Sequence, residues 1–155
     1  MNTHTLAMRP ATLADAKQVA ACVQVAYQHY IPIIGQEPGP MLDDYAQIIA
    51  QHTVWVIEDK SVIVGLIVLM EKKEGILLDN VAVNPRYQGR GLGKRLMEWA
   101  EKEVMKRGGK QITLYTHEKM TQNIQIYNKI GYVEIERREE FGFQRVYMRK
   151  RLPGH

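Results

Sequence analysis

An apolar segment that runs into a glycine-rich turn and then an amphipathic helix is the strongest constraint on how this 155-residue chain can fold. The segment Ile76–Val83 has the aliphatic and β-branched character of a buried strand. Gln88–Lys94 follows with three alternating glycines, and apolar residues at helical spacing then extend to Val104. A strand that turns through glycines into a helix N-terminus directs backbone N–H groups toward phosphate oxygens. The same turn carries four cations, Arg86, Arg90, Lys94 and Arg95, so we expect a phosphate-bearing ligand there.

The spacing of these glycines excludes two familiar phosphate motifs. The dinucleotide fingerprint G-x-G-x-x-G would need a glycine at Lys94. The P-loop G-x-x-x-x-G-K-S/T would need a glycine at Gln88 and a hydroxyl residue at Arg95. The pattern that remains is Gln88-x-x-Gly91-x-Gly93.

This pattern resembles the pyrophosphate-binding motif Q/R-x-x-G-x-G/A of the GCN5-related N-acetyltransferases (GNAT). A second segment, Tyr127–Tyr132, is similar to the family signature Y-x-K-x-G-F/Y. The two motifs lie about 35 residues apart, each on the element where the family carries it. The resemblance covers essentially the whole chain and implies one α/β GNAT domain over residues 1–155. Its central sheet is expected to be mixed, mostly antiparallel, splayed at the cofactor cleft and flanked by helices.

The hydrophobic pattern of the rest of the chain predicts a compatible order of elements. A short strand is followed by two helices, three strands, a helix, a strand, a helix and two strands. Prolines and glycines between Ile31 and Pro40 predict a loop between the first two helices. The predicted elements are Leu6–Met8, Thr12–Tyr30, a helix from about Met41, Val54–Ile57, Val62–Met70, Ile76–Val83, a helix from the glycine turn to Arg107, Gln111–Thr116, Thr121–Ile130, Tyr132–Arg138 and Arg145–Arg151.

Composition argues against several other classes of protein. One cysteine, Cys22, rules out an internal disulfide framework and fits a reducing compartment. No apolar run approaches the ~20 residues of a membrane span, and the polar N-terminus has no signal-peptide core, so we expect a cytoplasmic protein with no membrane partner. A net charge of +4 suggests an anionic ligand. With only two Phe and two Trp, the chain lacks the stacking aromatics of a nucleic-acid-binding domain.

The resemblance implies that acetyl-CoA is the cosubstrate and that no metal is needed. The pantetheine arm would pair with the backbone of Val81, Ala82 and Val83, which form an unpaired strand edge in this family. Asn123 either contacts the pantetheine or is a plain amide on the helix surface. The pyrophosphate would lie on the turn formed by Gln88, Gly89, Arg90, Gly91, Leu92, Gly93 and Lys94.

The resemblance also implies a direct transfer of acetyl to an amine. Tyr127 matches the family's general acid, which protonates the departing thiolate. The family often places a Glu or His base where this chain has Tyr115. The base would then be Asp79 or His117, either acting through water, with Glu118 a lesser candidate. Asp79 precedes Val81 by two residues, which predicts the same strand face.

The acceptor is expected to be a small amine held among Tyr30, Tyr115 and His117. The apolar run Tyr30–Ile34 would be costly if fully solvated, so we expect the first interhelical loop to fold over the cleft as a lid. Two alternatives remain open: a protein or peptide N-acetyltransferase, and a non-catalytic acetyl-CoA-binding module. The edge of the C-terminal hairpin is a candidate surface for a homodimer.

Overall fold

The computed structural model describes residues 6–153 and contains one mixed sheet of seven strands. The strands are β1 (Ala7–Pro10), β2 (Thr53–Asp59), β3 (Val62–Lys72), β4 (Gly75–Val83), β5 (Gln111–His117), β6 (Val133–Glu140) and β7 (Phe143–Arg151). Their order across the sheet is β1-β2-β3-β4-β5-β7-β6. Only β4 and β5 run parallel, so the sheet is mostly antiparallel, as the sequence predicts.

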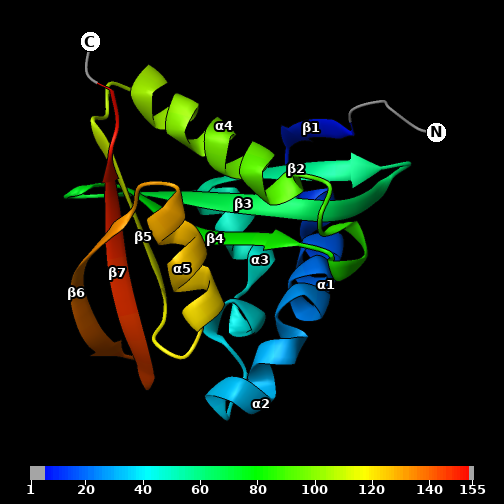
Figure 1. Ribbon diagram of the computed structural model, residues 1–155. Helices are drawn as coiled ribbons and strands as arrows, with labels where there is room; N and C mark the ends of the chain where they lie inside the picture. The colour runs from blue at the N-terminus through cyan, green and yellow to red at the C-terminus, as the bar shows by residue number, and fades with distance from the viewer. Residues whose placement is uncertain (1–5, 154–155) are drawn as a thin grey trace.

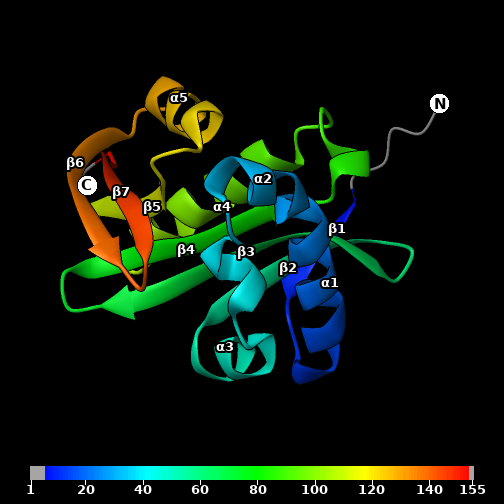
Figure 2. The same ribbon diagram turned by 90° about the horizontal axis from the view of Figure 1, so that it is seen from below.

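Helices cover both faces of this sheet (Figures 1 and 2). They are α1 (Ala16–Tyr27), α2 (Ile31–Ile34), α3 (Tyr45–Gln51), α4 (Leu92–Lys106) and α5 (Thr121–Lys129). The long helix α4 and the shorter α5 lie on one face, whereas α1 and α3 lie on the other. Within residues 6–153, four short 3-10 helices join these elements: η1 (Leu13–Asp15), η2 (Gln28–Tyr30), η3 (Gly39–Leu42) and η4 (Pro85–Tyr87).

The structure corrects the boundaries expected for the first two helices. The predicted helix Thr12–Tyr30 begins and ends in the 3-10 turns η1 and η2. The predicted loop after it contains α2, which ends where Gly35 adopts a left-handed conformation with φ of +89°. The second helix begins at Tyr45 because Asp44 is its N-cap and accepts a hydrogen bond from the Gln47 N–H.

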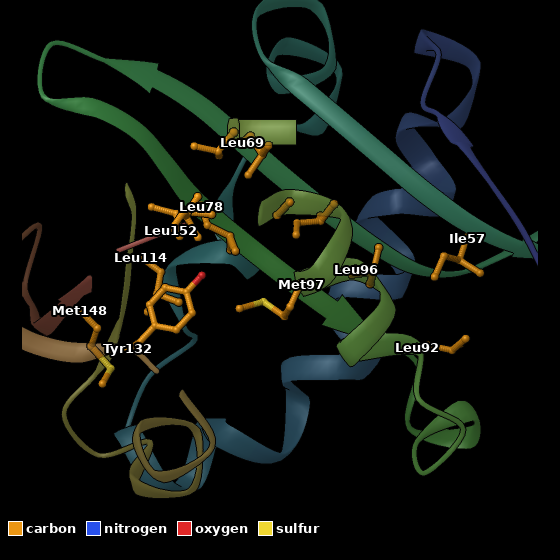
Figure 3. Close-up of a cluster of buried hydrophobic side chains, with 14 of the residues drawn as sticks. Ile57, Leu69, Leu78, Leu92, Leu96, Met97, Leu114, Tyr132, Met148 and Leu152 are labelled. Carbon is orange, nitrogen blue, oxygen red and sulfur yellow. The ribbon is translucent and has the colours of Figure 1, made fainter. Parts of the chain in front are cut away.

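Two apolar clusters, one on each face of the sheet, account for most of the core. The cluster under α1 and α3 includes Val23, Leu66 and the free thiol of Cys22. The cluster under α4 includes Leu96, Leu114 and Tyr132 (Figure 3). Both faces of β3 and β4 are therefore buried, which explains why these strands are nearly continuous apolar runs in the sequence.

Strands β4 and β5 separate shortly after they pair. Only Leu77–Thr113 and Leu78–Leu114 are matched, after which the strands diverge. On its other side β4 pairs with β3 as far as Val83. The edge of β4 that faces β5 therefore pairs with no strand from Val81 onward, as expected for a sheet splayed at a cofactor cleft, although the Val81 carbonyl accepts a hydrogen bond of 3.2 Å from the Tyr27 hydroxyl.

A bulge in β4 shifts the pairing with β3 at Asp79. Leu69 pairs with Leu78 but Val68 pairs with Asn80, so Asp79 is an extra residue in the ladder.

Among the helices of residues 6–153, none is long and apolar enough to cross a membrane.

Candidate active site

The glycine-rich turn leads directly into the N-terminus of α4. Gly91 is the N-cap residue with φ of +78°, and Gly89 has φ of +82°. A side chain at either glycine would have open space around it, so the left-handed backbone rather than crowding favours glycine there. Within residues 6–153, no backbone N–H from Gly89 to Lys94 donates a hydrogen bond. These free donors at a helix N-terminus suit an anionic ligand.

Not all of the cationic side chains around this turn are free to contact a phosphate group. Arg86, Arg90 and Lys94 are exposed, and the Arg90 guanidinium lies 4.7 Å from the centre of the Tyr87 ring. Arg95 instead donates a hydrogen bond of 2.6 Å to the carbonyl of Leu6, so it ties the start of the described chain to α4. Three of the four cations thus remain available to phosphate groups.

A small cavity of about 50 Å³ lies where β4 and β5 part. We call it the acceptor cavity. Strand residues Val81 and Tyr115 line it together with Asn123 and Tyr127 of α5. The segment Pro38–Pro40 and Ile34 of α2 close it from the other side. Of the run Tyr30–Ile34 that was expected to form a lid, only Ile34 lines the cavity, and Ile33 is half exposed; the cover is formed mainly by Pro38–Pro40.

Tyr127 projects from α5 into the acceptor cavity. Burial raises the pKa of its hydroxyl to about 12, with a smaller contribution from Tyr30. The hydroxyl has no hydrogen-bond partner in the described part of the chain, while the ring packs edge-on against Tyr132 at 6.0 Å. Tyr127 is thus protonated at neutral pH and free to donate into the cavity.

Asp79 reaches the same cavity from the β4 bulge. Its Oδ1 accepts a hydrogen bond of 2.9 Å from the Tyr115 hydroxyl. Burial raises the pKa of Asp79, and this hydrogen bond partly opposes the shift. The prediction that Asp79 shares a strand face with Val81 is wrong, because the bulge breaks the alternation: Val81 packs against the α4 cluster, whereas Asp79 meets Tyr115.

His117 also lines the acceptor cavity, at the end of β5. Its Nδ1 accepts a hydrogen bond of 3.0 Å from the Lys119 N–H, and burial lowers its pKa. A neutral imidazole that accepts through Nδ1 carries its proton on Nε2. His117 is therefore arranged less favourably than Asp79 to take a proton from an amine.

Asn123 and Tyr30 meet each other across the mouth of the cleft. The Tyr30 hydroxyl donates a hydrogen bond of 3.1 Å to Oδ1 of Asn123. Asn123 lines the acceptor cavity, whereas Tyr30 does not. Of the two side chains expected to hold the acceptor besides His117, the structure brings Tyr115 into the cavity and leaves Tyr30 beside it.

The sequence did not single out a buried chain of hydrogen bonds beneath the cavity. The Tyr27 hydroxyl donates to Oδ1 of Asn80 at 2.7 Å, and Nδ2 of Asn80 donates to the Tyr45 hydroxyl at 3.0 Å. The Tyr45 hydroxyl then donates to the carbonyl of Pro40 at 2.6 Å. The only signal in the sequence is a polar residue, Asn80, inside an apolar strand.

Arg145 of β7 is a second functional candidate that the sequence did not single out. Its guanidinium lies 4.1 Å from the centre of the Tyr115 ring and pairs with Glu140 at 3.2 Å. It therefore forms part of the cavity wall. Nearby, partial burial and the charge of Asp79 raise the pKa of Asp43 to about 6.

Comparison with known protein families agrees with this geometry. The model of an acetyltransferase (GNAT) domain matches residues 50–134, which is more than half of the chain. The chain belongs to the GNAT superfamily. It is therefore an N-acetyltransferase, an acyltransferase of a fold that binds acetyl-CoA.

Solved GNAT structures share the fold along nearly the whole chain. A GNAT acetyltransferase from Staphylococcus aureus superposes with a TM-score of 0.81 at 15% identity, covering 96% of this chain and 100% of that one. PaiA N-acetyltransferase from Thermoplasma acidophilum, solved with coenzyme A, gives a TM-score of 0.77 at 18% identity over 96% and 99% of the two chains. The ribosomal-protein-S18-alanine N-acetyltransferase from Escherichia coli gives 0.72 at 16% identity over 96% and 94%. A sequence search of curated proteins found no match.

Proposed function

We propose that this GNAT protein is a single domain over residues 1–155 that transfers acetyl from acetyl-CoA to the amine of a small molecule. The observation that carries the proposal is that the structure contains both features: unbonded N–H groups at the N-terminus of α4 and the acceptor cavity. The glycine turn of α4 offers unpaired N–H groups and three cations, and Tyr127 of α5 and Asp79 of β4 both line the cavity.

The residues present fit the cofactor. The N–H groups from Gly89 to Lys94 and the charges of Arg86, Arg90 and Lys94 would hold the pyrophosphate. The strand edge of β4 at Val81, Ala82 and Val83 would pair with the pantetheine amides as a sheet edge pairs with an added strand, with the Tyr27 hydroxyl giving up the Val81 carbonyl. Asn123 would add a side-chain contact to the cofactor once its hydrogen bond from the Tyr30 hydroxyl is replaced by one from the ligand. When bound, acetyl-CoA supplies a thioester-activated acetyl group.

Two side chains would then manage the protons of the transfer. Asp79, whose pKa is raised by burial, is the better placed group to accept a proton from the attacking amine, directly or through water. Tyr127 would donate its hydroxyl proton to the leaving thiolate. His117 would serve in orienting the acceptor because its Nδ1 is already engaged.

The cover over the cavity favours a small acceptor. Gln36 donates a hydrogen bond of 3.3 Å to the carbonyl of Gly142, so the segment after α2 contacts the β6–β7 turn. Gly39 lies close to Phe143 and Arg145 of β7. These contacts hold the cover against β7 and narrow the approach to the cavity, which favours a compact acceptor.

Acetyl-CoA binding tests the cofactor half of the proposal. Isothermal titration calorimetry should show binding that Gly91→Asp weakens at least about tenfold, because a carboxylate is placed where phosphates lie. Gly108→Asp is the matched control: Gly108 also has a positive φ and open surroundings, but lies beyond the other end of α4. Equal loss in both variants, or no heat with the wild type, would refute the site.

Competition kinetics test the acceptor half. Small amines and peptides with free N-termini should be compared by release of free CoA, and the best small amine should have the higher kcat/KM. A peptide that exceeds every small amine would identify a protein N-acetyltransferase instead. Binding of acetyl-CoA with no transfer to any acceptor would identify a non-catalytic module.

A further inference from the structure

A larger groove of about 870 Å³ adjoins the acceptor cavity. We call it the acceptor groove. Cavity and groove share five lining residues: Gly39, Asp79, Tyr115, Phe143 and Arg145. The cavity itself has room for little more than the amine end of a molecule, whereas the groove falls within the ~300–1,000 Å³ of typical ligand pockets. If the proposed function holds, an acceptor with its amine in the cavity would lay its body along the groove.

Phe141 at the rim of this groove is not explained by the turn that contains it. Phe141 and Gly142 form the two-residue turn between β6 and β7, with φ of +54° and +81°. A turn with two positive φ values favours Asn-Gly or Asp-Gly, because a bulky first residue is strained there. The Phe141 side chain is also 88% exposed. The chain thus tolerates both backbone strain and exposed aromatic surface at the edge of the groove.

Two further apolar side chains open onto the same groove. Leu42, at the end of η3, is 61% exposed. Ile135 is the extra residue of a bulge in β6, because Glu134 pairs with Met148 and Glu136 pairs with Tyr147. Without that bulge Ile135 and Glu136 would lie on opposite faces, yet both line the groove. Three exposed apolar groups from three separate segments therefore converge on one hollow.

The charges of the groove favour a cation over an anion. Six carboxylate side chains and four lysine or arginine side chains line it. Arg138 and Arg145 are paired with Glu136 and Glu140, so much of the positive charge on the β6–β7 wall is neutralised. Among residues 6–153, by contrast, Asp79 has only the Tyr115 hydroxyl as a partner, and Asp43 forms no ion pair. An ammonium group would relieve this imbalance, whereas a carboxylate beside the amine would add to it.

We propose that the acceptor is a primary amine with an aryl or branched aliphatic body and no carboxylate next to the amine. The amine lies in the cavity beside Asp79 and Tyr115. The apolar body lies in the groove against Phe141, Leu42 and Ile135. Phe141 is then a specificity-determining residue, and the strain of its backbone is tolerated because its ring covers the acceptor.

Three amines separate the features of this acceptor in a steady-state assay of CoA release. 2-Phenylethylamine has the apolar body alone, L-phenylalanine adds the carboxylate, and 1,4-diaminobutane replaces the body with a second charge. We expect kcat/KM for 2-phenylethylamine to exceed each of the others at least about tenfold, the factor that burial of a phenyl ring typically gives. Equal or lower kcat/KM for 2-phenylethylamine, with transfer to the other amines intact, overturns the acceptor class and leaves the proposed function standing. Loss of transfer to all three amines together with loss of acetyl-CoA binding overturns both.

Phe141→Asn tests the role of the side chain, because asparagine suits the turn and keeps the fold. We expect its ratio of kcat/KM for 2-phenylethylamine over 1,4-diaminobutane to fall at least about fivefold, while the thermal midpoint stays equal or rises. Leu13→Asn is the control, since Leu13 is also an exposed apolar side chain but lies outside the groove. An unchanged ratio in Phe141→Asn, or an equal fall in Leu13→Asn, would show that Phe141 does not select the acceptor.

Discussion

Single residues acquire their roles here from neighbours that are distant in the sequence. Tyr127 has the same chemistry as Tyr132 five positions later, yet the two differ completely in use. Tyr132 is fully buried in the α4 cluster with no partner for its hydroxyl (Figure 3). Tyr127 presents its hydroxyl to the acceptor cavity. Of the two tyrosines, only Tyr127 is suited to donate a proton to a ligand.

Replacement of Tyr127 by phenylalanine removes the proposed acid and keeps the ring. We expect kcat to fall by about 10²–10⁴-fold, the usual contribution of a positioned general acid. The free energy of unfolding and the affinity for acetyl-CoA should change little, because the hydroxyl bonds no other described residue. Turnover with the best acceptor, measured beside a urea titration, checks both. Wild-type turnover in Tyr127→Phe would assign Tyr127 to the core.

The ionisation of Asp79 predicts how the activity depends on pH. A base must be ionised to act, and burial raises the pKa of Asp79 above the ~3.9 of an ordinary aspartate. The kcat/KM for the acceptor should therefore rise with pH through this raised pKa. Asp79→Asn keeps an acceptor for the Tyr115 hydroxyl but should lose this limb of the profile together with most of the activity.

The stability of Asp79→Asn gives an independent readout. A carboxyl whose pKa is higher in the folded state binds more protons there than in the unfolded state, so it destabilises the fold as pH rises. Asp79→Asn should therefore be more stable than the wild type at neutral pH, and this difference should shrink on acidification. A variant that loses stability at pH 7 would mean that the ionised Asp79 is held by partners other than Tyr115.

At the scale of elements, the β4 bulge and the chain of hydrogen bonds from Asn80 connect the cover to the sheet. Tyr27 of α1 and Tyr45 of α3 both bond to Asn80. Tyr45 then holds Pro40 above the acceptor cavity. The hydrogen bonds all run in one direction, from Tyr27 through Asn80 and Tyr45 to Pro40. The buried side chains of Asn80 and Tyr45 therefore both donate and accept a hydrogen bond.

Tyr45→Phe breaks the last link of this chain. It leaves the Asn80 amide and the Pro40 carbonyl without their shared partner, which should cost roughly 1–3 kcal/mol of the free energy of unfolding. Because the cover then loosens, KM for the acceptor should rise several-fold while KM for acetyl-CoA stays within about twofold. Chemical denaturation and initial rates with each substrate varied in turn give these values. A parallel rise in both KM values would indicate general disorder of the fold instead.

At the scale of the whole molecule, one ion cluster fastens the first strand to the rest of the sheet. Arg9 of β1 donates to Asp15 of η1 at 2.8 Å and to Glu58 of β2 at 2.9 Å. The hydrogen bond from Arg9 and that from the Thr12 N–H lower the pKa of Asp15 to about 2. Among residues 6–153, Asp15 is the one charged residue that is buried.

This cluster predicts part of the acid sensitivity of the fold. A carboxyl with a lowered folded pKa contributes stability that is present above its unfolded pKa of ~3.9 and lost as pH falls through the folded value. Asp15 should therefore contribute about 2 kcal/mol at pH 7, which disappears between roughly pH 4 and pH 2. Urea titrations across this range should show the loss in the wild type and its absence in Asp15→Asn, which is less stable at pH 7. An unchanged pH profile in Asp15→Asn would mean that the Arg9 cluster does not hold the first strand.

The sequence by itself determined the order of the strands and of the longer helices, but not α2, and it determined the phosphate-binding turn. Both depend on contiguous residues: apolar periodicity specifies a strand or a helix locally, and the glycines of Gln88–Lys94 specify a turn that only a left-handed backbone allows. The resemblance to the GNAT family depended on two such local motifs and is confirmed. The assignments within these motifs, Tyr127 included, stay predictions for the experiments above.

Tertiary structure alone decided which side chains share the acceptor site. The β4 bulge turned Asp79 toward Tyr115, and the insertion of β7 between β5 and β6 brought Arg145 over the Tyr115 ring. The bulge in β6 likewise turned Ile135 into the acceptor groove. Strand alternation read from a sequence assumes an unbroken ladder, and a bulge or a strand insertion depends on pairing partners far along the chain. For that reason the cofactor turn could be located from sequence, whereas the acceptor site could be located only in part: Asp79, Tyr115, His117 and Tyr127 were named, but Arg145 and Ile135 were not.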